Sequence, residues 1–312
     1  MVPRSRLLLA LAGALLMAAC ASAPGPTSEQ DGATPAAEPR AGTTAPASSA
    51  EATTLPLDAF VPTAEQWEVL NRASGLLEQD CMRRLGFANW QPPDPKVTGG
   101  RPPMFPFGIV DAQQAAKHGY HDPRVAEINH QQRQRPRLNA QQQAQERAEL
   151  AALTGDSSFA TLPGRQVPPD GCSGEAERKL RTGAPEFDVN LYGELITEAD
   201  QRAVADGRVR AVIEAWSACM KRTGFDYGSP LELAQPEGNQ WSTPAPTRVE
   251  IATARADVAC KQQTDLPRVW LAVVAGYQRQ LIEQHRLGLD QMSKELEYRI
   301  RRANDTLQGH QG

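Results

Sequence analysis

Residues 63–87 read TAEQWEVLNRASGLLEQDCMRRLGF, and this stretch decides the fold. Thr63 followed by Gln66 is a capping-box signature, which is typical of the first turn of a helix. Gly86 suits the other end, because glycine adopts the left-handed backbone of a helix C-cap without strain. Between these ends, apolar side chains fall near one helical face, at Trp67, Leu70, Leu77, Cys81 and Leu85. The stretch therefore predicts an amphipathic helix that buries one side.

Two further segments carry strong helical patterns. The first runs from a capping box at Thr197 and Asp200 to Gly224, with apolar positions at Val209, Val212, Ile213, Trp216 and Met220. The second is the longest and runs from about Pro267 to Ala303. Its apolar stripe consists of Trp270, Val274, Tyr277, Leu281, Leu289, Met292, Leu296 and Ile300.

The rest of the folded part reads as weaker helices and long loops. Helices are expected at residues 111–118, 138–153, 174–180 and 247–261, and loops rich in Pro, Gly, Ser and Asp at 91–104, 155–171 and 229–246. Only residues 107–110 and 188–192 resemble short strands. The prediction is an all-α or mainly α domain over residues 57–312 with a long C-terminal helix.

A short internal repeat ends two of the predicted helices. Residues 81–87 (CMRRLGF) recur as residues 219–225 (CMKRTGF), and a second cysteine follows each copy. The repeat suggests two related halves, residues 57–185 and 186–312. The alternative is that both copies reflect common helix-end chemistry.

The folded part contains four cysteines, Cys81, Cys172, Cys219 and Cys260. An even number in an exported chain favours disulfide bonds, and three pairings are possible. The repeat favours Cys81–Cys172 and Cys219–Cys260, one bridge in each half. A zinc site or a redox pair is the alternative, but no Cys-x-x-Cys spacing occurs.

The N-terminus has the pattern of an export signal. Arg4 and Arg6 precede an apolar run over residues 7–17, and small residues precede Cys20. The run is too short to cross a bilayer as a helix. Residues 16–20 (LMAAC) resemble the lipobox of bacterial lipoproteins, although a methionine stands where leucine is usual. The resemblance implies a signal peptide over residues 1–19, lipid such as palmitate on Cys20, and a membrane-anchored protein outside the cytoplasm. The alternative is an ordinary cleaved signal with an incidental Cys20.

Residues 21–56 are dominated by Ala, Pro, Ser, Thr and Gly and have a single large aliphatic residue, Leu55. Such a segment buries too little apolar surface to offset its ordering entropy, so residues 20–56 are expected to form a disordered linker behind the lipidated cysteine.

Composition argues against nucleic acid as a partner. The chain of 312 residues has a formal net charge of −4 at pH 7, and cleavage after residue 19 would remove two arginines. Nucleic-acid binding depends on Lys and Arg neutralising phosphates. Arg133, Arg135 and Arg137 form only a small basic patch without interleaved aromatic residues.

No spacing typical of a hydrolase, zinc protease or nucleotide-binding loop occurs, so catalytic residues stay unknown and no cofactor is expected. His118 and His121 have a spacing that could hold a metal, but a turn explains them better, and no metal site is predicted. Glu194, Glu198 and Asp200 could form a glycosidase carboxylate pair, although acids also favour helix starts. The remaining candidates are Phe105 and Phe107, which either contact a partner or pack in the core.

Several phrases resemble exported actinobacterial lipoproteins with a C-M-R-x-x-G motif. They are residues 81–95, 107–111, 119–121 and 168–172, and the bias toward Ala, Arg and Pro is similar. This resemblance implies no activity, so no functional residue is carried over.

The expected function is that of a cell-envelope lipoprotein that binds a protein or a cell-wall polymer without catalysis. The alternatives are a cell-wall hydrolase with an unrecognised site and a small-molecule-binding lipoprotein. A buried carboxylate or His cluster in a cleft favours the enzyme, and a deep apolar pocket favours the ligand binder.

Overall fold

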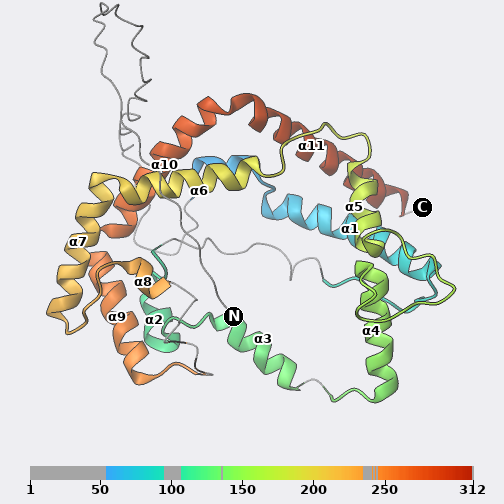
Figure 1. Cartoon of the computed structure of the whole chain (residues 1–312), viewed down its shortest axis with the longest axis horizontal. Coiled ribbons are helices and arrows are strands. Elements are labelled where there is room, and N and C mark those ends of the chain that lie inside the picture. Colours follow the sequence, from blue (N-terminus) through green and yellow to red (C-terminus); the bar gives the residue numbers. More distant parts are fainter. Residues whose placement is uncertain are drawn as a thin grey trace, which may run out of the picture. The chain divides into compact units, whose positions relative to one another are not determined.

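The computed structural model describes residues 54–94, 107–134, 136–234, 241, 243 and 245–310. All regular elements among these residues are helices, which confirms the mainly α prediction (Figure 1). The short strands expected at residues 107–110 and 188–192 are wrong: the first is irregular, and the second leads into a helix that begins at Leu191. The signal region, Cys20 and nearly all of the linker lie outside the described residues.

In chain order the elements are η1 (Pro56–Phe60), α1 (Ala64–Arg84), α2 (Ala112–His118), α3 (Pro123–Gln134), α4 (Ala140–Thr154), α5 (Gly171–Arg181), α6 (Leu191–Ala205), α7 (Gly207–Arg222), α8 (Pro230–Ala234), α9 (Arg248–Gln263), α10 (Leu266–Gln284) and α11 (Arg286–Gly309). None of these helices is both long enough and apolar enough to cross a membrane. Helix α8 falls where the sequence predicted a loop, and α3 lies in a stretch for which no element was predicted.

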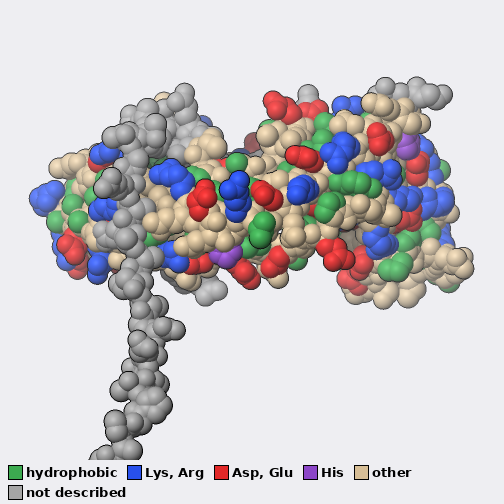
Figure 2. All heavy atoms as spheres, turned by 90° about the horizontal axis from the view of Figure 1, so that it is seen from above, with side chains coloured by type: hydrophobic (Ala, Val, Ile, Leu, Met, Phe, Trp, Pro, Cys, Tyr) green, Lys and Arg blue, Asp and Glu red, His purple; other side chains and the backbone are tan. Residues whose placement is uncertain are grey.

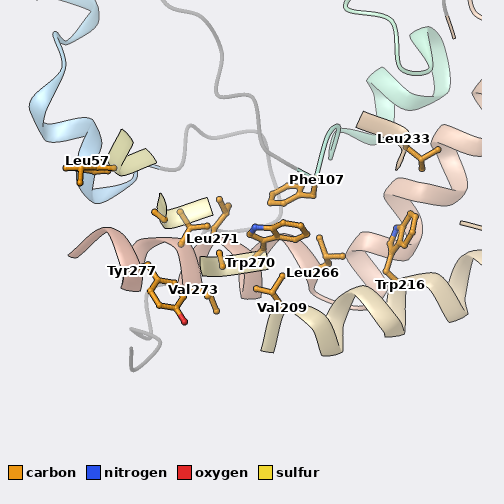
Figure 3. Close-up of a cluster of buried hydrophobic side chains, with 14 of the residues drawn as sticks. Leu57, Phe107, Val209, Trp216, Leu233, Leu266, Trp270, Leu271, Val273 and Tyr277 are labelled. Atoms are coloured by element: carbon orange, nitrogen blue, oxygen red, sulfur yellow. The ribbon is translucent and has the colours of Figure 1, made fainter. Parts of the chain in front are cut away.

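The largest core lies where α10 packs along α6 and α7, with α9 beside α7 (Figure 1). Trp270 and Trp216 are fully buried there. Phe107 is also fully buried, and its ring centroid lies 5.6 Å from that of Trp270 (Figure 3). The alternative in which Phe107 packs in the core is therefore the one that the structure contains, whereas Phe105 lies outside the described residues.

A second group of helices forms around α1. Helix α11 packs along α1, and α5 packs against both and against α4 (Figure 1). The buried residues shared by α1, α5 and α11 are Leu70, Ala73, Leu77, Ala176, Leu180 and Ala303. The last helix of the chain thus completes the core begun by the first long helix, so the two proposed halves share a core at this point.

Both disulfides join the cysteines that the repeat favours. Cys81 at the end of α1 is bonded to Cys172 at the start of α5, and Cys219 at the end of α7 is bonded to Cys260 at the end of α9. The disulfide-stapled helical fold is thereby confirmed. The second cysteines come from opposite ends of their helices, and two related halves stay a prediction.

The repeat itself has one conformation in both copies. Gly86 and Gly224 have positive φ angles of 84° and 92°. The following Phe87 and Phe225 donate their backbone N–H groups to the carbonyls of Met82 and Met220, five residues earlier, at 2.9 and 3.0 Å. This is the Schellman helix ending, which explains why glycine and an apolar residue recur together.

One predicted helix is broken by a cap. Residues 197–223 do not form a single helix, because Asp206 has an extended backbone (φ −69°, ψ 135°) and its side chain accepts the Arg208 N–H at 2.9 Å. The capping role assigned to Thr197 is wrong, since its hydroxyl donates to the Gly193 carbonyl inside α6. Tyr277 on α10 donates to the same Asp206 carboxylate at 3.1 Å and holds the break in place.

The long C-terminal helix is present as α11, with 24 residues, but residues 267–303 are not continuous. The break lies at His285 (φ −111°, ψ 22°) between α10 and α11. At this bend, a Cβ on Gly288 would lie 2.6 Å from Leu191 Cδ2. Glycine therefore allows α11 to pass close to the start of α6.

Candidate functional site

An open, polar pocket of about 400 Å³ lies where the end of α1 meets the loop before α5. We call it the arginine pocket and define it by Cys81, Arg84, Leu85, Arg165, Gln166 and Glu175. Helix α1 supplies one wall, α5 supplies Glu175, and the loop supplies Arg165. The Cys81–Cys172 disulfide ties α1 to α5 at this wall and so fixes the distance between them.

Arg165 is held by an aromatic ring. Its guanidinium carbon lies 4.5 Å from the ring centroid of Phe87, which is itself buried. The Arg165 side chain is exposed, and no described carboxylate forms an ion pair with it. The Phe87 ring carries no oxygen acceptor, so this contact leaves the N–H donors of the guanidinium able to bind a ligand.

Glu175 is the acidic group of the pocket, and two cations share it. Arg84 Nη2 donates to both Glu175 oxygens, at 2.6 and 2.7 Å, and Lys179 Nζ lies 2.6 Å from Oε1. Burial raises the pKa of this carboxyl, but Lys179 and Arg84 outweigh burial and hold the pKa below its ordinary value. Three cationic groups and one ionised carboxylate leave the site with an excess of positive charge.

A second polar cluster lies inside the protein, between α9 and the segment around α2. Asp257 and Lys261 are 0% and 1% exposed, and Lys261 Nζ lies 2.8 Å from Asp257 Oδ2. Trp216 Nε1 donates to Asp257 Oδ1 at 3.0 Å, and the Tyr120 hydroxyl donates to Oδ2 at 3.2 Å. Lys261 also donates to the Ile109 carbonyl at 2.9 Å. We call this set the buried charge cluster.

Burial shifts the pKa of each ionisable group in this cluster toward its neutral form. It raises the pKa of Asp257, opposed by Lys261, and lowers the pKa of Lys261, opposed by Asp257. Burial also raises the pKa of Tyr120, helped by the Asp257 charge. Shifted ionisable groups are common in active sites, but they also occur in structural ion pairs. The hydrogen bonds of Asp257 and Lys261 to Trp216, Tyr120 and the Ile109 carbonyl are typical of a structural ion pair.

Beside this cluster, His121 joins two segments. Its Nδ1 lies 2.8 Å from Glu250 Oε1, and its Nε2 lies 2.7 Å from the Thr243 carbonyl. Both partners are acceptors, so the imidazole satisfies them together only as the protonated, doubly donating form. The hydrogen bond to the Thr243 carbonyl raises the pKa of His121, and Glu250 adds to this effect. Burial opposes both.

The metal alternative for His118 and His121 finds no support in this geometry. The His121 backbone N–H donates to the His118 carbonyl, which makes a turn, and the His121 ring faces Glu250 instead of His118. Among the described residues, no group of three His, Cys, Asp or Glu side chains could hold a metal ion.

The other candidates are not brought into one site. Glu198 pairs with Arg202 on its own helix at 2.5 Å, and burial raises the pKa of Asp200 on the same helix. Arg133 and Arg137 are exposed at the end of α3 and just after it, and Arg135 lies outside the described residues. On the face that Figure 2 shows, basic and acidic side chains alternate and hydrophobic ones form only small groups.

Sequence reasoning did not single out Arg84, Arg165 or Glu175. Arg84 lies inside the repeated motif, but the motif signals a helix ending and gives no sign of the carboxylate of Glu175. Arg165 lies in an irregular loop without periodicity, so no sequence signal relates it to Phe87. Only the fold brings these groups together.

Comparison of the chain with protein-family models, with curated proteins and with solved structures gives no match.

Proposed function

We propose that the chain is a lipid-anchored protein outside the cytoplasm that binds a partner in the cell envelope without catalysing a reaction. A wall polymer is the partner that we favour. The signal-like N-terminus and the lipobox resemblance support this localisation. Two disulfides suit an oxidising compartment, because such bonds persist outside the cytosol.

The arginine pocket is the observation that carries the binding role. It is open to solvent, it is lined mainly by polar groups, and Arg165 offers donors that no described carboxylate occupies. A deep apolar pocket would instead favour an apolar small molecule. Exposed aliphatic side chains, such as Val125, Val189 and Leu287, are scattered over different elements.

The localisation is tested by fractionation of cells that express the full chain or its Cys20→Ala variant. The parent should sediment with membranes, and the variant should appear in the soluble extracytoplasmic fraction. Retention of Cys20→Ala on membranes would contradict lipid anchoring through this residue, because alanine has no thiol that could carry the acyl chains.

Partner binding is tested by in-cell cross-linking and by sedimentation of the full chain carrying Cys20→Ala with isolated cell walls. We expect co-sedimentation with walls, or one dominant cross-linked envelope protein. Failure of the protein both to sediment with walls and to cross-link to a partner would refute the proposal. Turnover of wall material by the purified protein would favour a hydrolase.

A further inference from the structure

The guanidinium of Arg165 is positioned before any ligand arrives. The Phe87 ring supports it at 4.5 Å, and Phe87 is fixed in turn by the Schellman ending of α1. Because the ring restricts the side chain, less conformational entropy is lost when its N–H groups bind a ligand. Positioning of this kind is a property of binding sites more than of solvated surface charge.

Arg84 lines the same cavity. Its Nη2 alone bonds Glu175 in the described part of the chain, so its remaining N–H donors are available. Two guanidinium groups therefore converge on a space of about 400 Å³, within the usual range for small-ligand sites. The planar forks of arginine match the paired oxygens of carboxylate and phosphate groups.

Charge selects the class of ligand. Glu175 is already neutralised by Arg84 and Lys179, so an incoming cation would meet repulsion and an incoming anion would meet attraction. The exposed lining of the space is mainly polar, which disfavours a lipid chain or an aromatic ligand.

We infer that the arginine pocket binds an oxyanion, a phosphate or a carboxylate, carried on an anionic polymer of the cell wall. The inference rests on the proposed function and specifies its ligand. The polymer follows from the proposed function, because a wall polymer carries many such groups, and repeated groups on one polymer raise the local concentration of the ligand at the pocket.

The test is calorimetric titration of the full chain carrying Cys20→Ala with three probes: inorganic phosphate, polyphosphate and polygalacturonate. The matched variants are Arg165→Gln and Arg301→Gln. Arg301 is a suitable control because it is also an exposed arginine over a ring, 6.0 Å from the Tyr298 centroid, and lies outside the pocket. Both variants remove one positive charge.

We expect at least one polyanion to bind. Arg165→Gln should lower the affinity for that polyanion by about tenfold or more, the loss typical of a charge-assisted hydrogen bond. Arg301→Gln should change affinity by less than about twofold, because a remote charge acts only through screened electrostatics. Equal weakening by both variants, or no binding of either polymer, would overturn the inference. Binding of inorganic phosphate as tight as that of the polymers would overturn the polymer as the source.

Sedimentation with isolated walls separates this inference from the proposed function. If Arg165→Gln still sediments like its parent, the pocket is not the wall-binding site, although the proposed function stands. If the parent fails to sediment and cross-links to no partner, the proposed function fails, whatever the titrations show.

Discussion

The ion pair between Asp257 and Lys261 permits a quantitative prediction about stability. The perturbations are Asp257→Asn, Lys261→Met and the double variant. Asp257→Asn keeps the size of the side chain and removes its charge, which leaves a buried ammonium group whose other partner is the Ile109 carbonyl. Lys261→Met leaves a buried carboxylate that still accepts from Trp216 and Tyr120.

The magnitudes follow from what each variant leaves unpaired. Removing one partner of a buried ion pair costs about 3–5 kcal/mol, and we expect Asp257→Asn to fall in this range. Lys261→Met should cost less, about 2–3 kcal/mol, because burial already raises the pKa of Asp257 and two neutral donors remain beside it. The double variant contains no buried charge. Its loss in the free energy of unfolding should therefore be smaller than the sum of the two single losses, by at least about 2 kcal/mol.

The assay is urea unfolding at neutral pH with both disulfides intact, followed by tryptophan fluorescence and by circular dichroism. Coincident transitions would justify a single free energy of unfolding for each variant. Two results would refute the reasoning: a loss below about 1 kcal/mol for Asp257→Asn, or additive losses in the double variant. Either would mean that the two groups do not form a coupled pair in the interior.

Three further predictions concern other contacts. His121→Gln should lower the melting temperature most at acidic pH: the folded pKa of His121 lies above its unfolded value of about 6.5, so its stabilisation is complete below that pH and is lost as pH rises through the folded pKa. A melting-temperature difference that grows from about pH 5 to 9 would contradict this assignment. Gly171→Ala should destabilise the fold by more than about 2 kcal/mol, and Gly164→Ala by about 1–2 kcal/mol. Both glycines have a positive φ, but only a Cβ on Gly171 would lie 2.3 Å from a backbone oxygen. Equal losses in thermal unfolding would count against this close approach. Replacing Cys219 and Cys260 together by Ala should cost about 4 kcal/mol on the chain-entropy model for a separation of 41 residues, measured by urea unfolding, and a neutral effect would show that the bridge adds no constraint.

The helical fold could be predicted because its signals are local. The capping box at Thr63 and the glycines at positions 86 and 224 mark helix ends through hydrogen bonds within a few residues. Apolar periodicity located the buried faces for the same reason, since it requires only the geometry of one helix.

The breaks at Asp206 and His285 could not be predicted in this way. Apolar residues continue on both sides of each break, so the periodic pattern reads as one long helix. At Asp206 the cap is local, since its side chain accepts the Arg208 N–H, and Tyr277, which lies 71 residues later in the chain, supports it. At His285 the accompanying contact is the close approach of α11 to Leu191.

The candidate site depends even more on distant contacts. Arg84 and Glu175 are 91 residues apart in sequence, and neither stands in a motif with known chemistry. The buried charge cluster was also missed: Lys261 and Asp257 have ordinary i, i+4 spacing, which usually indicates a solvated helix face. Burial of that face by Trp216 and Tyr120 is a property of the assembled helices.

The order of the disulfides bears on how the protein matures. Each cysteine is bonded to the next one along the folded part, Cys81 to Cys172 and Cys219 to Cys260. A chain that emerges N-terminus first presents the first pair before the third cysteine appears. Oxidation in order of emergence therefore forms only native bridges, and the slow reshuffling of mispaired thiols, which takes minutes to hours without a catalyst, is not needed. Covalent maturation can thus be complete before α11 arrives to close the core around α1.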